Sequence, residues 1–354
     1  MSERLRCAVL GTGATGLAHL LSLQSCPHAT TVAIAESDAS RAKELSDRFK
    51  IPRSYTDFHE VLDQPDVEAV TIALPNHLHA EAALEALKAR KDVFVEPPAA
   101  LSHKEVAKLV ETARRMKRTL VVGQHHRLRR DVQMAKVVID RGDLGDIYHV
   151  RAFGFQRAGL PAEGSWQALK ASAGGGALLA LGQGLLDLAL YLLKDFNVES
   201  CVASVGTHFG GKSAAESSKR RNSSKSANVV FDVEDFASAH LSLKRSCTIV
   251  LETGWGGFLP PNVPEQGLEL LGTQGSLSLF PARLQRKGPD GYESVELQVP
   301  LAAEGEDLVH QFVEGVLHRR KPVVPLEDVL AMQQIMDALY TSARSKREVK
   351  LKMK

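Results

Sequence analysis

Residues 7–16 read CAVLGTGATG, and this stretch decides the fold of the first third of the chain. Its apolar start predicts a buried strand, and the leucines after Gly16 recur at helical spacing. The glycines form the pattern G-x-G-x-x-G, in the strand–turn–helix setting that binds the pyrophosphate of a dinucleotide. Gly11 permits the tight turn, Gly13 leaves room for the phosphates, and Gly16 lets the helix approach the strand. The cofactor contacts predicted from this stretch are Gly11, Thr12, Gly13, Ala14, Thr15 and Gly16.

An acidic side chain follows the next apolar run. Residues 31–35 end in Glu36, twenty residues beyond Gly16. A carboxylate at this point accepts hydrogen bonds from the adenosine ribose hydroxyls and repels a 2′-phosphate, so NAD is favoured over NADP. Ser37 and Arg41 keep NADP open, because both could reach a phosphate placed just beyond the strand.

Strand-like and helix-like segments alternate through residues 1–125. Such alternation predicts an α/β domain with a doubly wound parallel sheet of the Rossmann type. The predicted strands are 7–10, 31–35, 69–74, 93–96 and 120–122. The helices between them include 80–89 and 106–116, and the second opens with the capping-box pattern Ser102-His103-Lys104-Glu105.

The pattern changes after about residue 146, and residues 126–354 are predicted to form a second, α+β domain. Turn residues separate its strand-like runs, which favours a large open sheet with mostly antiparallel connections. The predicted strands are 147–155, 203–209, 229–243, 248–254, 268–271 and 277–280, and the predicted helices are 177–193, 307–318 and 326–343. The polar, serine-rich and basic segment 212–226 is predicted to be a loop.

Composition excludes few functions but favours an ordinary globular protein. The 354 residues are 44% hydrophobic and 24% charged, with a formal net charge of +2, which gives no broad electrostatic case for nucleic acid or membrane partners. The apolar runs fall short of a membrane span, and the four cysteines lack metal-binding spacing. We expect buried, reduced thiols, no metal and a cytoplasmic location. Residues 206–213 match the P-loop pattern G-x-x-x-x-G-K-S, but no amphipathic helix follows, so we interpret the match as coincidence.

Polar residues follow the third, fourth and fifth predicted strands, where an open parallel sheet binds its ligands. After the third strand, Asn76 and His79 are predicted to face the nicotinamide half of the cofactor; helix capping by Asn76 with an exposed His79 is the alternative. Glu96 ends the fourth strand, and a cis bond before Pro98 is plausible there. The further cofactor contacts predicted from these ends and from the second strand are Glu36, Ser37, Leu74, Pro75, Asn76, His79, Glu96 and Pro98.

The fifth strand is followed by titratable and cationic groups that supply the candidates for proton transfer or for binding an acidic substrate. A solvated hinge between the domains is the equal alternative for this segment. Later in the chain, a glycine-rich turn at 174–176 leads into a nearly all-apolar helix. Its most notable polar residue, Gln183, could point into a cleft. The catalytic candidates are His125, His126, Arg127 and Gln183.

The chain resembles the glucose–fructose oxidoreductase, inositol dehydrogenase and MocA family (Gfo/Idh/MocA) over nearly its whole length. This resemblance implies a Rossmann domain, a C-terminal domain with a mixed sheet, tightly held NAD(P), and dimers or tetramers that pair through the large sheet. The motifs that carry it are 11–16, Pro75-Asn76 with His79, 93–96, 142–145, Trp166, 174–176, 234–236, 271–276 and 325–328.

Three departures from the family pattern concern its catalytic positions. The family's lysine of Glu-Lys-Pro is Pro97 here, and its helical Asp and His are Ala180 and Gly184. A positioned general acid or base contributes roughly 10²–10⁴ in rate, so ordinary sugar-alcohol oxidation needs another proton group. Candidates are His79, the 125–127 segment or the substrate itself.

Three functions therefore stand after the sequence alone. The leading hypothesis is an NAD(P)-dependent oxidoreductase acting on a small sugar- or cyclitol-like substrate through a non-standard active site. The first alternative is a non-catalytic NAD(P)-binding regulatory or scaffold protein, or a carrier that only sequesters the cofactor. The second is an enzyme similar to the biliverdin reductases, which share the architecture and also lack the lysine; residues 95–102 look somewhat like their corresponding segment.

Overall fold

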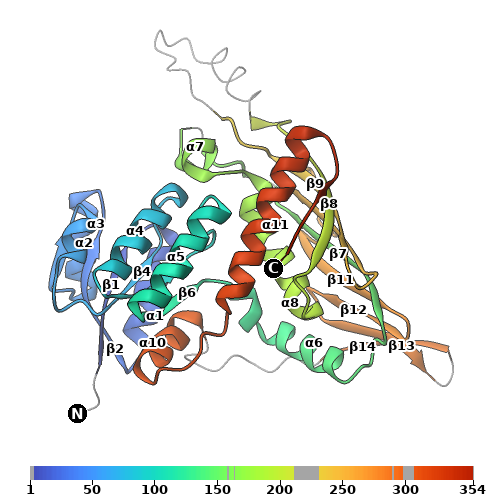
Figure 1. Ribbon diagram of the computed structural model, residues 1–354, viewed down its shortest axis with the longest axis horizontal. Helices are drawn as coiled ribbons and strands as arrows, with labels where there is room; N and C mark the ends of the chain where they lie inside the picture. Colours follow the sequence, from blue (N-terminus) through green and yellow to red (C-terminus); the bar gives the residue numbers. More distant parts are fainter. Residues whose placement is uncertain are drawn as a thin grey trace, which may run out of the picture. The chain divides into compact units, whose positions relative to one another are not determined.

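The computed structural model describes residues 4–157, 159–162, 164–210, 231–288, 291–297 and 307–353 (Figure 1). These residues divide into two compact units. Unit one comprises 4–125 with 307–333, and unit two comprises 126–297 with 334–353. In this division residues 307–333 group with the first 125 residues. The domain bounds 1–125 and 126–354 stay a prediction.

Unit one is built on a six-stranded parallel sheet in the order β3-β2-β1-β4-β5-β6. This order reverses between β1 and β4, which is the point where open α/β sheets bind ligands. The strands are β1 (Leu5–Leu10), β2 (Ala29–Ala35), β3 (Arg53–Tyr55), β4 (Ala69–Ile72), β5 (Asp92–Val95) and β6 (Leu120–Val122). The helices are α1 (Ala14–Ser25), α2 (Ala39–Phe49), α3 (Phe58–Leu62), α4 (Asn76–Lys88), α5 (His103–Met116) and α10 (Leu308–Leu317), and α11 (Leu326–Ser345) begins in this unit.

The predicted α/β pattern of unit one is confirmed, with shifts at element ends. The third strand stops at Ile72 rather than at residue 74, and α4 begins at Asn76, four residues before the apolar stripe on which the prediction rested. Ser102 caps α5, since its side chain accepts from the Glu105 N–H, and its hydroxyl donates to the Glu105 carboxylate at 2.8 Å.

The C-terminal segment completes the core of unit one. The rings of Phe94 on β5 and Phe312 on α10 have centroids 5.9 Å apart, and Val324 is fully buried in the cluster under α4 and α5. Asp307 caps α10 and also accepts a hydrogen bond from Ser22 on α1 at 2.8 Å. Apolar burial is the main driving force for such docking, so the last helix of the Rossmann unit comes from the far end of the sequence.

Unit two contains a nine-stranded sheet in the order β14-β13-β12-β11-β7-β10-β9-β8-β15. The pair β7–β10 is parallel, and the other neighbours are antiparallel. The strands are β7 (Ile147–Phe155), β8 (Val198–Gly206), β9 (Phe236–Leu243), β10 (Thr248–Gly254), β11 (Gln266–Gly272), β12 (Gly275–Leu279), β13 (Arg283–Gly288), β14 (Gly291–Glu296) and β15 (Val349–Lys350). The predicted large, mostly antiparallel sheet is confirmed.

Helices of unit two pack on this sheet, and the sequence after β6 enters a 3₁₀ turn. That turn is η1 (His125–Leu128), followed by α6 (Arg130–Asp140); further along lie η2 (Trp166–Ala168), α7 (Lys170–Ala173), the π-helical turn η3 (Leu178–Gly182) and α8 (Gln183–Leu193). The run 170–193 is long and apolar enough to span a membrane by length and composition, but 78% of that window is buried in the protein. A core helix explains its apolarity.

Four predicted strands of unit two have different bounds: those at 268–271 and 277–280 differ by one or two residues, and the other two differ more, next to Asp235. The strand expected at 203–209 ends at Gly206, and the strand expected at 229–243 begins at Phe236. The Asp235 carboxylate accepts hydrogen bonds from the N–H groups of His208, Phe209 and Gly210, and so folds both segments into turns. The loop predicted at 212–226 and the lysine and serine of the P-loop match lie outside the described residues.

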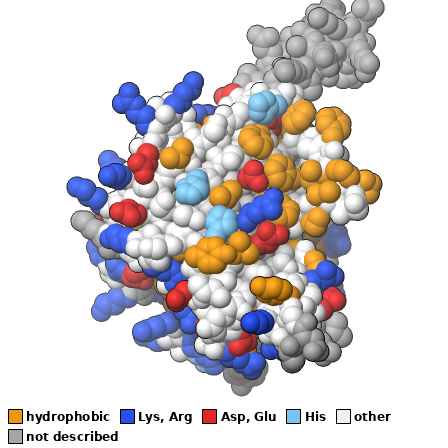
Figure 2. All heavy atoms as spheres, turned by 90° about the vertical axis from the view of Figure 1, so that its right-hand side faces the viewer, with side chains coloured by type: hydrophobic (Ala, Val, Ile, Leu, Met, Phe, Trp, Pro, Cys, Tyr) orange, Lys and Arg blue, Asp and Glu red, His pale blue; other side chains and the backbone are white. Residues whose placement is uncertain are grey.

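The outer face of the large sheet carries mixed side chains (Figure 2). Val150 and Ala152 on β7 are buried, so Arg151 between them points to the opposite face, where it pairs with Glu269 at 3.7 Å. Figure 2 shows hydrophobic side chains, histidines and charged side chains of both signs next to one another on this face. Pairing of two copies through this sheet stays a prediction.

Candidate functional site

The glycine loop between β1 and α1 uses its three glycines in three ways. Gly11 has φ +84°, and a Cβ there would lie 2.6 Å from the Ala73 carbonyl oxygen. A Cβ on Gly16 would lie 1.9 Å from the Gly11 carbonyl oxygen, so the helix could not pack. A Cβ on Gly13 would meet nothing within 4 Å. Two glycines are therefore required by the protein's own packing, and the third borders open space.

That open space lies at the N-terminus of α1, where Gly13 occupies the cap position and no side chain caps the helix. Free N–H groups and the positive end of the helix dipole favour an anion there. The loop thus fits the pyrophosphate of a dinucleotide, and Gly13 is the position at which backbone and phosphates would approach each other most closely.

Glu36 stands beside this loop at the end of β2 and is held in place by it. Its carboxylate accepts hydrogen bonds from the Thr12 hydroxyl and N–H, from the Asp38 N–H at 3.2 Å and from the Ser37 hydroxyl at 3.3 Å. Partial burial alone would raise the pKa of Glu36, but these hydrogen bonds outweigh it and lower the pKa. An ionised, fixed carboxylate is what ribose hydroxyl recognition requires.

Arg41 lies on the same side of the loop. Its Nη2 donates to the Thr12 carbonyl at 2.6 Å, and its Nε is 3.9 Å from the Glu36 carboxylate. The guanidinium therefore contacts the loop itself, while its side chain stays partly exposed. That Ser37 and Arg41 could reach a 2′-phosphate stays a prediction.

His79 is not exposed, which contradicts the alternative given for it; its contact with the nicotinamide half stays a prediction. It is buried, and its Nδ1 and Nε2 lie 2.8 and 2.7 Å from the carbonyl oxygens of Pro98 and Leu74. Burial lowers the pKa of His79, and the two carbonyls only partly oppose this effect. The ring joins the loop after β4 to the cis Pro97–Pro98 segment after β5. The ring is held by these two contacts, so we interpret it as a residue that positions both loops.

The other residues of these two loops stay close to their predicted places. Asn76 is the first residue of α4 and Pro75 stands at the cap position, so Asn76 is not the cap of that helix. Leu74, Pro75 and Asn76 are half-buried at the carboxyl edge of the sheet. The cis bond between Pro97 and Pro98 agrees with the expectation from the sequence.

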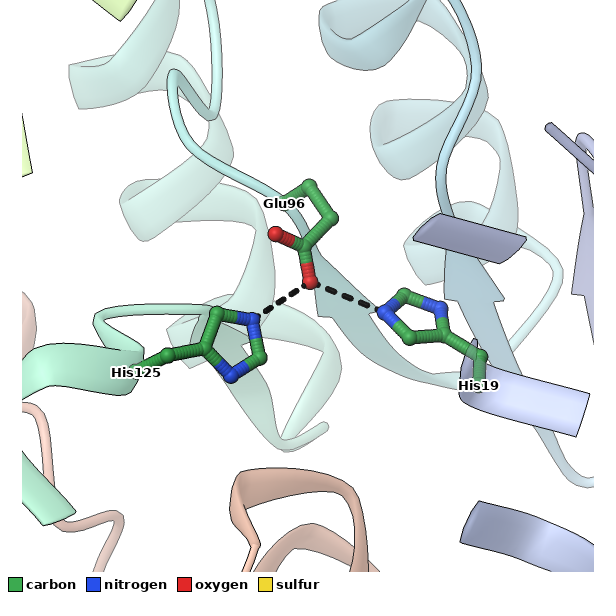
Figure 3. Close-up of side chains that lie close together, drawn as sticks. All are labelled: His19, Glu96 and His125. Carbon is green, nitrogen blue, oxygen red and sulfur yellow. Dashed lines mark hydrogen bonds and ion pairs between the residues drawn. The ribbon is translucent and has the colours of Figure 1, made fainter. Parts of the chain in front are cut away.

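Glu96 stands at the centre of a cluster with His19 and His125 (Figure 3), here called the Glu96 cluster. The Nε2 atoms of both histidines lie 2.8 Å from the same carboxylate oxygen, Oε1. A Cβ on Gly123 would lie 3.0 Å from that oxygen and from His125 Nε2, so a glycine is needed there. The cluster joins α1, the end of β5 and the start of η1.

The charges of the Glu96 cluster support each other. Burial alone would raise the pKa of Glu96, but the hydrogen bonds from His125 and His19 lower it to about 2. Burial alone would lower the pKa of His125, and the Glu96 carboxylate reverses this, so the net shift is upward. The ligand atoms lie within 4.8 Å of one another, close enough for one divalent cation. Hydrogen bonds account for both contacts, and we interpret the cluster as hydrogen-bonded.

Sequence reasoning named two members of this cluster and missed His19. The residue sits on the buried face of α1 and interrupts its leucine stripe, three residues after Gly16. A histidine on an apolar face is the one signal that a buried polar partner lies nearby.

Arg127, one of the catalytic candidates, is buried within unit two, and its catalytic role stays a prediction. Its guanidinium is 1% exposed and binds the Asp187 carboxylate through Nε at 2.9 Å and Nη2 at 2.7 Å. It also lies over the rings of Tyr191 and Phe196, at 4.9 and 5.5 Å. This bidentate pair fixes η1 to α8 inside unit two.

The remaining candidates lie on or beside η3 and α8. Gln183 is buried, whereas Ala180 is exposed and Gly184 half-buried. A Cβ on Gly184 would lie 3.1 Å from Cδ2 and 3.4 Å from Nε2 of the His126 ring. Among the catalytic candidates in unit two, His126 is the one whose ring lies next to Gly184.

Comparison with known proteins agrees with this geometry. A profile described as "Oxidoreductase family, NAD-binding Rossmann fold" matches residues 5–124, and one described as "GFO/IDH/MocA C-terminal domain" matches 132–278. The D-glucoside 3-dehydrogenase of Escherichia coli is 26% identical over 99% of this chain and 98% of its own. The levoglucosan dehydrogenase of Pseudarthrobacter phenanthrenivorans is 31% identical over 57% of this chain and 54% of its own.

Solved structures share the fold over the whole chain. A levoglucosan dehydrogenase in complex with NADH and L-sorbose superposes with a TM-score of 0.84 at 23% identity, covering 99% of this chain and all of that one. An aldose–aldose oxidoreductase from Caulobacter crescentus superposes with a TM-score of 0.81 at 22% identity and the same coverage. The two profiles, the glycine loop and the paired domains together place this chain in the Gfo/Idh/MocA family of NAD-binding oxidoreductases.

Proposed function

We propose that this protein is an NAD-dependent oxidoreductase that transfers a hydride to or from a small sugar- or cyclitol-like substrate through a non-standard active site. The observation that carries the proposal is the nucleotide loop: Gly13 borders open space at a helix N-terminus, and the Glu36 carboxylate is fixed beside it. When bound, the nicotinamide supplies the acceptor or donor of the hydride.

The relatives support the substrate class. Their printed names include a glucoside 3-dehydrogenase, a levoglucosan dehydrogenase and a myo-inositol 2-dehydrogenase. All act on ring compounds with several hydroxyl groups. We extend to this chain the class they share, a cyclic polyol, and no single compound.

The active site is non-standard because three positions lack a titratable group. Pro97, Ala180 and Gly184 cannot move a proton, so the proton group must come from elsewhere in the chain or from the substrate itself. Arg127 and His79 are held inside the protein by their own contacts. The two histidines after β6, His125 and His126, are at least partly exposed.

The test has two stages. The purified protein is titrated with NADH and NADPH by cofactor fluorescence, and we expect tighter binding of NADH. Formation of NADH from NAD⁺ is then followed with a panel of glucosides, anhydrosugars and inositols. Tight binding without turnover of any compound in the panel would contradict the proposal.

The second candidate is a non-catalytic NAD-binding protein. The absence of a titratable side chain at Pro97, Ala180 and Gly184 favours it. It predicts NADH binding without turnover, and capture of a partner protein that depends on Gly13. A reductase of linear tetrapyrroles is the third, and it predicts oxidation of NADH by a bilin but by none of the sugars. Pairing of copies through the large sheet and a cytoplasmic location belong to the proposal as well.

A further inference from the structure

A large open cavity lies at the amino edge of the parallel sheet, within unit one. Its volume is about 1420 Å³, above the roughly 300–1,000 Å³ of most small-molecule sites. It is lined by the segments that lead into β1, β4, β5 and β6 and by the segment between α10 and α11. The glycine loop follows β1 at the opposite, carboxyl edge of the sheet, so this cavity is separate from the nucleotide loop.

The lining of this cavity is strongly basic. The described residues that form it include ten lysines and arginines but only four aspartates and glutamates. Three of the carboxylates already have an arginine of the same lining as partner, in the pairs Glu68–Arg6, Asp92–Arg118 and Glu327–Arg114. The cations that remain therefore outnumber the carboxylates that could balance them.

Four of these remaining cations are exposed and form neither an ion pair nor a side-chain hydrogen bond with the described part of the chain: Arg90, Lys117, Arg319 and Lys321. A cation is favoured at the C-terminus of a helix, which accounts for the first three, since they stand at the ends of α4, α5 and α10. The helix ends do not account for Lys321, nor for the gathering of all four around one cavity.

One wall of the cavity is preformed by a buried lysine. Lys91 is 4% exposed, and its Nζ donates to the carbonyl oxygens of Gln64 at 2.7 Å and Val67 at 2.9 Å. This ammonium group joins the segment before β5 to the segment before β4. A site whose backbone is fixed in advance loses less conformational freedom when it binds a compound.

The chemistry of the lining selects a class of compound. Guanidinium and ammonium groups bind phosphate oxygens through charge-assisted hydrogen bonds. The described residues of the lining include no aromatic side chain, so a nucleobase would have no ring to stack on. We propose that this cavity binds a small, multiply phosphorylated compound without an aromatic ring, recognised through its phosphate groups. The site lies outside the proposed function and does not depend on it.

The experiment uses the full chain in the presence of NADH, which occupies the glycine loop, and inorganic tripolyphosphate. Binding is measured by isothermal titration calorimetry at a physiological ionic strength of about 0.15 M. We expect one tripolyphosphate per chain, and at least about 10-fold weaker binding when Arg320→Gln is combined with Lys321→Gln, because charge-assisted hydrogen bonds are lost. The matched control combines Lys43→Gln with Arg48→Gln on the exposed face of α2, and should bind like the wild type. No binding to the wild type, or equal weakening in both double variants, overturns the proposal.

Citrate tests whether phosphate is the group that is recognised. Its carboxylates carry fewer acceptor oxygens than phosphate groups do, so we expect citrate to bind at least about 10-fold more weakly than tripolyphosphate. Equally tight binding of citrate would show that the cavity attracts any small anion, and would overturn the proposal.

A second measurement needs no variant and locates the bound compound in the wild type. Lysine side chains are acylated with an amine-reactive reagent, and the modified positions are quantified by mass spectrometry. Tripolyphosphate should slow the modification of Lys117 and Lys321, which line the cavity, and should leave that of Lys43 unchanged. Equal protection of all three lysines, or of none, would place the compound elsewhere and overturn the assignment.

Discussion

At the scale of single residues, the three loop glycines are equivalent in the sequence motif but not in the structure. Gly16 has a carbonyl oxygen 1.9 Å from where a Cβ would stand, and Gly13 has nothing within 4 Å. We predict that Gly16→Ala destabilises the fold by on the order of 3 kcal/mol through overpacking, whereas Gly13→Ala leaves unfolding unchanged and weakens NADH binding at least 10-fold. Thermal unfolding and fluorescence titration of the two variants test this. Equal loss of stability in both would contradict it.

Glu36 decides between the two dinucleotides. Its carboxylate is fixed by Thr12 and by the N–H of Asp38, so removing the charge leaves a polar pocket with Arg41 nearby. We predict that Glu36→Ala weakens NADH binding by about 1–2 kcal/mol, because ribose hydrogen bonds are lost, and that it strengthens NADPH binding. The control is Glu44→Ala on the exposed face of α2. An unchanged ratio of the two affinities would show that Glu36 does not read the ribose.

Single-residue roles could be predicted where the partner is local and not where it is distant. The glycine loop and Glu36 form within one strand–helix–strand unit, and their motif specifies their geometry. The burial of His79 was not foreseen, because its acceptor Pro98 is 19 residues away. The ion pair of Arg127 was not foreseen, because Asp187 is 60 residues away. The sequence around a histidine or arginine does not show whether the side chain will bind a buried carboxylate or carbonyl that is distant in the chain.

At the scale of elements, the Glu96 cluster ties α1, β5 and η1 through one carboxylate oxygen. The pKa of Glu96 is about 2, below its ordinary value of 4.5, so its stabilising effect is complete above pH 4.5 and is lost as the pH falls toward 2. We predict that Glu96→Gln lowers the free energy of unfolding at pH 7 by about 2 kcal/mol and flattens its dependence on pH across that window. Urea unfolding at several pH values measures both effects.

The same variant reports on His125. Its pKa is raised by Glu96, so the contribution of this contact is present at pH below 6.5 and fades as the pH rises through the folded-state pKa. In Glu96→Gln the pKa of His125 should fall, as measured by NMR titration of its ring. A titration curve that does not move would mean that Glu96 does not control His125.

The buried pair of Arg127 and Asp187 fixes η1 to α8 and gives an element-scale test of a structural role for Arg127. We predict that Arg127→Met costs about 3–5 kcal/mol in stability, because it leaves the Asp187 charge buried without its partner. Arg129→Met, the same change two residues on at a partly exposed side chain, should cost at most about 0.5 kcal/mol. Chemical unfolding of both variants decides. A stable Arg127→Met would contradict this role.

Most elements were predicted with the right type, but strands β3, β13, β14 and β15 were missed and many element ends were wrong. Hydrophobic periodicity predicts which segments are strands, since it depends on residues within the segment itself. The ends of β8 and the start of β9 depend on Asp235, whose carboxylate holds the N–H groups of His208–Gly210 in turns. A run of strand-forming residues cannot show that a distant carboxylate will end it.

At the scale of the whole molecule, the order of the sequence and the order of the fold differ. The Rossmann pattern ends at β6 in the sequence, but the unit is completed by 307–333. Nothing in the first 125 residues indicates a missing helix, and the amphipathic α10 does not specify which of two hydrophobic surfaces it will cover. Only the packing of Phe312 on Phe94 and the burial of Val324 reveal it.

This arrangement predicts that residues 1–125 do not form an autonomous domain. Without α10 and Val324, the fragment exposes Phe94 and the surface under α4 and α5, and the loss of one buried aromatic contact alone costs roughly 3–5 kcal/mol. That loss is a large part of the total stability of a domain, about 5–15 kcal/mol. We expect the fragment to lack a cooperative thermal transition and to bind NADH at least 10-fold more weakly than the full chain. Fusing 302–333 to it through a flexible linker should restore both, and the same fusion with Phe312→Ala should restore neither fully. A fragment 1–125 that unfolds cooperatively and binds NADH as the full chain does would show that the C-terminal segment merely rests on a complete domain.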